Sequence, residues 1–271
     1  MVTQAGPQSQ HLIKPSSVKK LIGSLTKLTE KFGQGKDVLS FTRGDALDYQ
    51  SWVALQKVSA AYQRTLQRYA KQLFAFAVDH EWILSNPFIK LKSSSLAAEN
   101  RHYVNEIDSE ALINACPTIG WKVLIGLARY AGIRIPSEIP DSWNSIDWEN
   151  RTITILAKKT KVRVCPIIPE LFKILEEAYA LKSTDKMVEI STCNLRRQFP
   201  KIIEKAGLAA WQDLFQTLRR SCATHLISDG FSQHNVAQWL GHSVKVSNEH
   251  YLMVRSEDFS KATGVKFNAK K

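Results

Sequence analysis

TLRRSCATHL, at residues 217–226, joins a basic start to a run of small and apolar residues. Its spacing predicts a helix over about 216–228, with Arg219 near the start of that helix. Farther along, LGHS at 240–243 comes directly after another helical pattern, and Tyr251 follows in the segment EHYL. Basic side chains and one tyrosine therefore stand beside successive helices in the C-terminal part of the chain.

The sequence upstream of these helices has a mixed pattern. AGIR at 131–134 closes an apolar helical segment, and two β-rich runs at 151–156 and 162–168 are separated by the lysine-rich turn KKTK at 158–161. Helical patterns resume after the second run. We therefore predict one mixed α/β but mostly helical domain over 105–256, with a small antiparallel sheet.

The N-terminal part of the chain predicts helices alone. Apolar residues recur at helical spacing from Val18 to Phe32, Gly33 is a suitable stop, and a shorter helix is expected around 45–55. Ser59 can cap a third helix, because its oxygen can accept a hydrogen bond from the first turn. The apolar face predicted for that helix consists of Tyr62, Leu66, Tyr69, Leu73 and Phe76.

These helices define an expected helical domain over 10–90. A Ser-rich and then polar linker is expected over 91–104. Two of the helices carry basic stripes, formed by Lys20, Lys27 and Lys31 and by Arg64, Arg68 and Lys71. Such stripes suit contact with a phosphate backbone, and a solvated surface face remains the alternative for either helix alone.

The composition favours a polyanionic partner. The chain has 37 Lys and Arg against 25 Asp and Glu, a formal net charge of +12, and nucleic acid is the simplest partner for such an excess. A basic protein that is merely soluble remains the alternative. No apolar run approaches the ~20 residues of a membrane span, and the polar start lacks an apolar signal core, so we expect a cytoplasmic protein.

Common metal and catalytic signatures are missing from the sequence. The four cysteines form no C-x-x-C pair, and the ligand-like spacing of Cys222 and His225 has no second pair to complete it. The phosphate-binding loop, the zinc-protease helix motif and the serine-hydrolase elbow are also absent. We therefore expect neither a metal nor a cofactor.

Taken in order, AGIR, the lysine turn, LRRSCATHL, LGHS and the following tyrosine resemble the boxes of the tyrosine recombinase (phage integrase) family. The resemblance covers about 105–256 well. It covers the preceding helices more loosely, as the helical core-binding (SAM-like) domain that such proteins carry in front. It implies that Arg134 and Arg219 clamp the reacting phosphate and that His242 donates a hydrogen bond to it.

The resemblance also implies covalent catalysis by Tyr251. The phenolate attacks phosphorus, a 5′-hydroxyl leaves, and the 3′-phosphotyrosine conserves the bond energy, so that no nucleotide cofactor is needed. Lys158 is the implied general acid for the leaving oxygen. Lys159 and Lys161 remain alternatives for that role and are otherwise expected to contact DNA.

Two positions depart from the family pattern. The family commonly has histidine three residues before the second arginine, and this chain has Gln216 there. Glutamine can hydrogen-bond but cannot accept a proton at neutral pH, so we expect a positioning role and slower cleavage. The acidic residue expected after Arg134 is Glu138, one position later than usual, and we expect it to orient an arginine or a helix end.

The implied function is site-specific recombination of duplex DNA, as by the integrase of a phage or mobile element. Recombination joins two duplexes through four cuts, which implies a homotetramer on double-stranded DNA, located with the nucleoid, and a tail at 257–271 that packs on a neighbouring protomer. Two alternatives remain. One is a type IB topoisomerase-like nicking and resealing enzyme, and the other is a DNA-binding protein of the same fold that has lost catalysis.

Overall fold

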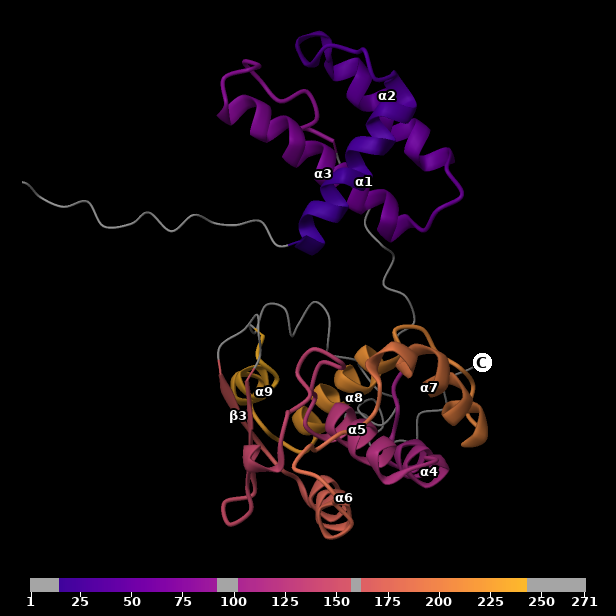
Figure 1. Ribbon diagram of the computed structural model, residues 1–271, viewed down its shortest axis with the longest axis vertical. Helices are drawn as coiled ribbons and strands as arrows, with labels where there is room; N and C mark the ends of the chain where they lie inside the picture. The colour runs from indigo at the N-terminus through magenta and orange to yellow at the C-terminus, as the bar shows by residue number, and fades with distance from the viewer. Residues whose placement is uncertain (1–14, 92–101, 157–161, 243–271) are drawn as a thin grey trace, which may run out of the picture. The chain divides into compact units, whose positions relative to one another are not determined.

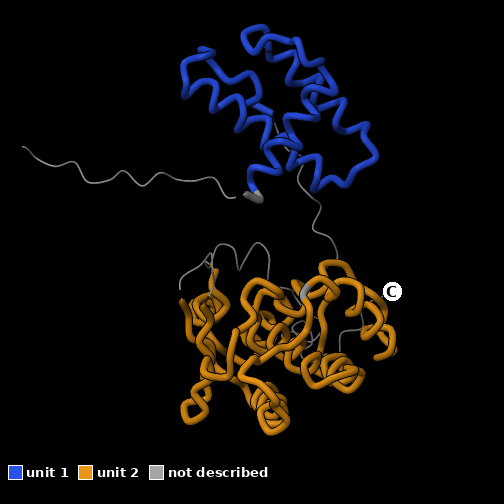
Figure 2. Tube along the Cα trace, viewed as in Figure 1, with its two compact units in different colours: residues 1–99 blue, residues 100–271 orange. Residues whose placement is uncertain are grey.

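The computed structural model describes residues 15–91, 102–156 and 162–242 of the 271-residue chain. The chain divides into two compact units, residues 1–99 and 100–271 (Figure 2). The division falls within the range expected for the linker, most of which lies outside the described residues. The domain bounds 10–90, 91–104, 105–256 and 257–271 therefore stay predictions.

All the regular secondary structure in the described part of unit 1 is helical, as the sequence predicts. It contains α1 (Pro15–Phe32), a short 3-10 helix (Val38–Ser40), α2 (Arg43–Leu55) and α3 (Ala60–Asp79) (Figure 1). The Ser59 hydroxyl accepts a hydrogen bond from the Tyr62 amide at 3.3 Å, which confirms the predicted cap of α3. Gly33 ends α1 with φ at +84°, a conformation that glycine adopts readily.

The buried face of α3 differs from the predicted stripe. Leu66 and Tyr69 are buried, but Tyr62 and Phe76 are 41% and 49% exposed. The core instead receives Phe74, whose ring stacks on that of Phe88 at a centroid distance of 4.5 Å. The returning segment after α3 covers this face, and the periodicity of α3 alone does not indicate which of two neighbouring faces that segment will cover.

Unit 2 is built around one helix that is buried along most of its length. This helix, α5 (Ile119–Tyr130), contacts α4 (Glu106–Ala115), α6 (Pro169–Ala180) and α8 (Leu214–Ser228). The remaining helices of the described part are α7 (Leu195–Lys205), α9 (Gln233–Leu240) and two 3-10 turns (Trp143–Ser145 and Thr192–Asn194). The sequence does not predict α4, because its apolar residues do not gather on one face: Ile107 is exposed, whereas the polar Ser109 is buried.

Within the described residues, three strands form one antiparallel sheet in the order β1-β2-β3. They are β1 (Ile146–Asp147), β2 (Thr152–Ile155) and β3 (Arg163–Pro166). The sequence predicts the two longer strands, and β1 is too short to show a period. The mainly helical fold with a small antiparallel sheet is confirmed, and β3 packs beside α9 (Figure 1).

Candidate active site

Two left-handed glycines end helices at the site, and each belongs to one of the sequence boxes. Gly241 has φ at +70° and follows α9. Its amide donates to the Gln238 carbonyl at 3.1 Å, and the His242 amide donates to the Ala237 carbonyl at 3.0 Å. This pair of bonds is a Schellman motif, which fixes His242 immediately after the helix. The other is Gly132, with φ at +60°, which follows α5 in the AGIR box.

The two glycine turns lie against each other. A Cβ atom on Gly132 would lie 2.8 Å from Cγ of Leu240, closer than real Cβ contacts come. Leu240 itself is buried at 1% exposure. The AGIR and LGHS boxes are far apart in sequence, but they are in direct van der Waals contact. Leu240 packs against Gly132 at a place that a Cβ atom would otherwise occupy.

Arg219 fastens these turns to α8. Its guanidinium donates Nη1 to the Gly132 carbonyl and Nη2 to the Leu240 carbonyl, the latter at 2.5 Å. The side chain is fully buried. The second predicted clamp is therefore held by the carbonyl oxygens at the ends of two helices, where a cation is favourable.

Arg134 lies beside the same turns and is more exposed. Its Nη1 donates to Glu138 Oε1 at 2.6 Å, and its Nη2 donates to the Gly241 carbonyl at 3.0 Å. The side chain is 29% exposed, whereas that of Arg219 is 0% exposed. A guanidinium has five N–H donors, so these contacts orient Arg134 and leave donors for a phosphate.

Glu138 is the shared anion of an arginine cluster. Its Oε2 accepts from Arg163 Nη2 at 2.5 Å and from the Arg134 amide at 3.0 Å, and it lies 3.7 Å from Arg219 Nη1. Burial alone would raise the pKa of Glu138, but the hydrogen bonds from Arg163 and Arg134 outweigh burial and hold that pKa below its ordinary value. The expected orienting role of Glu138 therefore has a geometric basis, with an extra arginine.

Sequence reasoning missed Arg163. It occupies the first position of β3 and is buried, with Nε donating to the Trp239 carbonyl at 2.8 Å. Cys165, the next inward position of β3, donates its Sγ to the same carbonyl at 2.9 Å. Side chains alternate between the two faces of a strand, so Arg163 points to the same face as Cys165, two residues later. That alternation could have indicated a buried position, although an arginine in a short strand ordinarily faces solvent.

A groove runs past the exposed side of Arg134. Its volume is about 680 Å³, and Arg134, Arg196 and Gln216 all contribute to its lining. Gln216 is half-buried in the first turn of α8, which begins directly after Asp213, a residue with φ at +52°. The glutamine at the usual histidine position therefore faces the same space as Arg134.

Several predicted site residues cannot be placed in this arrangement. Tyr251, Lys158, Lys159 and Lys161 lie outside the described residues. In unit 1, Lys20 and Arg68 are exposed, and Lys31 and Arg64 are half-buried. Two further basic residues have partners within unit 1: Lys27 pairs with Glu30 at 2.6 Å on the surface, and Lys71 donates to the Leu91 carbonyl at 2.5 Å.

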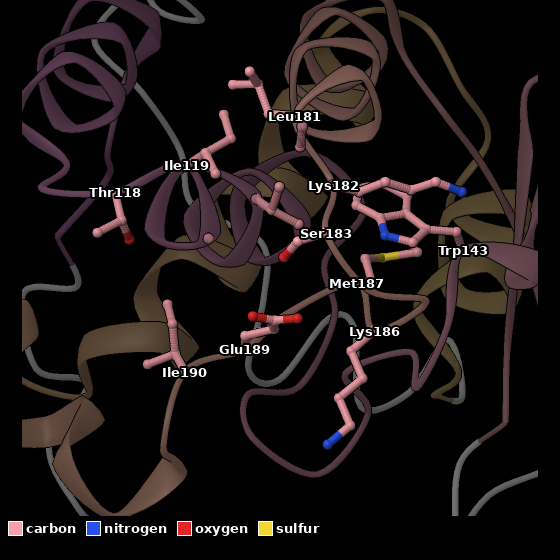
Figure 3. A pocket seen from close by; sticks show the side chains of 13 residues that line it. Thr118, Ile119, Trp143, Leu181, Lys182, Ser183, Lys186, Met187, Glu189 and Ile190 are labelled. Carbon is pink, nitrogen blue, oxygen red and sulfur yellow. The ribbon is translucent and has the colours of Figure 1, made fainter.

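A second cavity lies away from the arginine cluster. It has a volume of about 280 Å³ and is lined by the start of α5, the end of α6 and the segment that follows α6. Figure 3 shows Trp143, Met187 and Glu189 among the side chains around it. None of the predicted site residues that are described line it. Across the described ranges, no helix is long and apolar enough to cross a membrane, and no group of His, Cys, Asp and Glu could hold a metal.

Curated relatives match most of the chain. The tyrosine recombinase XerC of Pelotomaculum thermopropionicum is 22% identical over 233 residues, which cover 76% of each protein. A tyrosine recombinase of Thermosipho africanus is 25% identical over 242 residues, which cover 83% of this chain and 84% of the relative.

Solved structures share the fold at lower identity. The Tn1549 transposon integrase in complex with circular intermediate DNA superposes with a TM-score of 0.76 at 14% identity, covering 94% of this chain and 95% of that one. A lambda integrase dimer bound to a core site gives 0.73 at 15% identity, covering 90% of each. The model of the phage integrase family matches residues 102–257, more than half of the chain. The chain therefore belongs to the phage integrase family, and it is a tyrosine-type site-specific recombinase.

Proposed function

We propose that this recombinase cleaves and rejoins duplex DNA through a 3′-phosphotyrosyl intermediate on Tyr251, as the integrase of a phage or mobile element. The main observation in support of this proposal is the arginine cluster around Glu138. Glu138 and the Gly241 carbonyl orient Arg134 at the edge of a groove, and His242 is fixed directly beside that carbonyl. An oriented guanidinium at an open surface suits the charge that develops on a phosphodiester during displacement.

In the proposed reaction, the Tyr251 hydroxyl gives its proton to solvent, and its oxygen forms a bond to phosphorus while the bond to the 5′-oxygen breaks. The non-bridging oxygens gain charge, which Arg134 and Arg219 neutralise, and His242 donates a further hydrogen bond. Lys158 gives its proton to the leaving 5′-oxygen. A single preorganised donor such as Arg134 is worth about 3–4 kcal/mol in the transition state. The positive charge of the buried Arg219 adds to it, so the two arginines can supply the electrostatic stabilisation without a metal.

The proposed partner is double-stranded DNA, bound by both units. The net charge of +12 supports this partner. Lys20 and Arg68 are exposed in unit 1, and we assign them direct phosphate contacts. Lys27 and Lys71 already have partners within unit 1, so we assign them to the basic surface without direct phosphate contacts. Lys31, Arg64, Lys159 and Lys161 complete the proposed contact set.

We also propose that the chain acts as a homotetramer on recombining sites, in the cytoplasm and associated with the nucleoid. A structure of lambda integrase records a tetramer on a Holliday junction, and that protein shares this fold at a TM-score of 0.73 and 15% identity. The proposed tail at 257–271 would contact a neighbouring protomer. Deleting it should abolish synapsis of two labelled duplexes while single-site cleavage persists.

The test is recovery of a covalent protein–DNA adduct without added metal. Fragmented DNA from the source organism is mixed with the protein, SDS-resistant complexes are collected, and the attached DNA is sequenced. The recovered site is then resynthesised with a nick near the cleavage position, which traps the adduct. Tyr251→Phe should give no adduct, and the matched control Tyr179→Phe, which alters a tyrosine of α6, should leave it intact.

One observation favours a second candidate. Gln216 stands in the groove where the family commonly has histidine, so a DNA-binding protein without catalysis remains an alternative. That candidate predicts a sequence-specific gel shift with no adduct from the unaltered protein. An adduct that persists in Tyr251→Phe would refute the proposed nucleophile and leave the family assignment untouched.

A further inference from the structure

We propose that Arg163 is a positioning residue of the recombination reaction: it links the strand after the lysine turn to Glu138 and to the glycine turn that carries His242. The inference rests on the proposed function above. It adds a residue that makes no contact with substrate and acts through the residues that do.

The contacts of Arg163 point in two directions. Nη2 reaches Glu138 at 2.5 Å, and Nε reaches the Trp239 carbonyl at 2.8 Å. Glu138 in turn holds Arg134 at 2.6 Å. One guanidinium therefore fixes the carboxylate that orients the exposed arginine and, at the same time, the last turn of the helix that precedes His242.

Packing adds a third restraint on the same turn. A Cβ atom on Gly241 would lie 3.0 Å from Cδ of Arg163 and 3.1 Å from its Nη1. The Arg163 side chain can pack this closely against Gly241 because glycine has no Cβ atom. A shift of Arg163 would remove one of the contacts that hold Gly241, the residue before His242.

The position of Arg163 in the chain explains why this link matters. It pairs with Ile155 across the sheet, at the ends of β2 and β3 nearest to the predicted lysine turn at 158–161. The strand that continues from those lysines is therefore fastened to Glu138. Arg163 therefore ties the first residue of β3 to the arginine cluster.

The geometry calls for arginine rather than lysine. Two acceptors on different elements are bound by Nη2 and Nε of one rigid plane, and an ammonium group offers only one centre. Nη1 is buried and has no hydrogen-bond partner among the described residues. The charged groups that face Glu138 are Arg134 from its own loop, Arg163 from β3 and Arg219 from α8, with the Cys165 thiol nearby.

Arg163→Lys is the principal variant, because lysine keeps the positive charge but cannot bind both acceptors from one planar group. The matched control is Arg129→Lys in α5, which is also buried and binds the Val104 carbonyl and Ser109 instead. The full-length proteins are compared by adduct formation in single turnover on the nicked recovered site. Gel shift gives affinity for the same duplex, and thermal melting gives stability.

We expect Arg163→Lys to slow adduct formation on the order of tenfold or more, the usual scale for a misplaced catalytic group, with affinity within about twofold of wild type. Arg129→Lys should keep the wild-type rate per folded molecule. A rate for Arg163→Lys equal to that of Arg129→Lys would overturn the inference. A wild-type protein that forms no Tyr251-dependent adduct would overturn the proposed function itself, which distinguishes the two failures.

The pH profile gives a readout that a purely structural role would not move. Without Arg163, Glu138 loses a hydrogen bond that lowers its pKa, so its carboxylate protonates at higher pH. Arg163→Met should therefore lose cleavage on the acid side at higher pH than wild type. Adding Glu138→Gln to that variant should remove this acid limb. An unchanged acid limb in Arg163→Met would contradict the link.

Discussion

Replacing Gly132 with alanine tests the contact between the two glycine turns. The new Cβ would lie 2.8 Å from Cγ of Leu240 and 3.1 and 3.2 Å from its methyl groups, so a buried side chain must shift. Overpacking of this kind costs about 1–3 kcal/mol. The left-handed φ of +60° adds about 1–2 kcal/mol for any residue with a Cβ. Gly132→Ala should therefore destabilise unit 2 by about 2–5 kcal/mol.

Gly207→Ala separates the two contributions. Gly207 also has a left-handed φ, +73°, and follows a helix of the same unit, but a Cβ there meets nothing within 4 Å. It should cost only the backbone part, about 1–2 kcal/mol, and the entropy that alanine removes from the unfolded chain is common to both variants.

The assay is urea unfolding of the full-length proteins followed by tryptophan fluorescence, together with the rate of adduct formation. Gly132→Ala should lower the free energy of unfolding by about 1–3 kcal/mol more than Gly207→Ala does, which is the overpacking part. Of the two variants, we expect only Gly132→Ala to slow adduct formation. Equal costs, within about 0.5 kcal/mol, would refute the claim that the AGIR and LGHS boxes are held together by this contact.

Three further outcomes are expected. Gln216→His should speed adduct formation, because histidine can accept the nucleophile's proton, and no gain or a loss would end the idea of a missing base. The pKa of the Glu138 carboxylate lies below its unfolded value of about 4.3, so the ionised carboxylate stabilises the fold fully above that pH and loses this effect as the pH falls through the folded pKa. The urea midpoints of wild type and Glu138→Gln should therefore converge on acidification. Midpoints that stay parallel would contradict the pairing of Glu138 with the arginines. If Lys158 is the general acid, cleavage by Lys158→Ala should recover on DNA whose leaving 5′-oxygen is replaced by sulfur, because a thiolate needs no proton; recovery in Lys159→Ala or Lys161→Ala instead would reassign the acid.

The short boxes predicted much of the site because each has a local physical cause. Gly132 and Gly241 adopt left-handed backbone at helix ends, and a glycine in such a place leaves a clear mark in a sequence. Arg134 and His242 come within two residues after those glycines, and Arg219 reaches both turns from α8 through the Gly132 and Leu240 carbonyls. Tyr251 and Lys158 remain predictions from the order of the boxes alone.

The rest depended on contacts that local patterns do not contain. Arg163 is a catalytic-domain strand residue whose partners, Glu138 and the Trp239 carbonyl, come from distant segments. Phe74 enters the core of unit 1 because Phe88 returns over it, although helical spacing favoured Phe76. In α3 the choice lies between neighbouring faces of the helix, and spacing alone does not decide it. In β3 the alternation is present, but an arginine in a short strand ordinarily faces solvent.

The arginine cluster also couples folding to ligand binding. Arg134, Arg163 and Arg219 meet a single carboxylate, Glu138, so the described residues leave a local excess of two positive charges. Such an excess is unfavourable in a partly buried site and favourable once a phosphate diester occupies it. By linkage, DNA or a simple oxyanion should raise the melting temperature of unit 2 in proportion to the logarithm of its concentration. The protein should thus be most stable with DNA bound, because the negative charge of one phosphodiester offsets half of that excess.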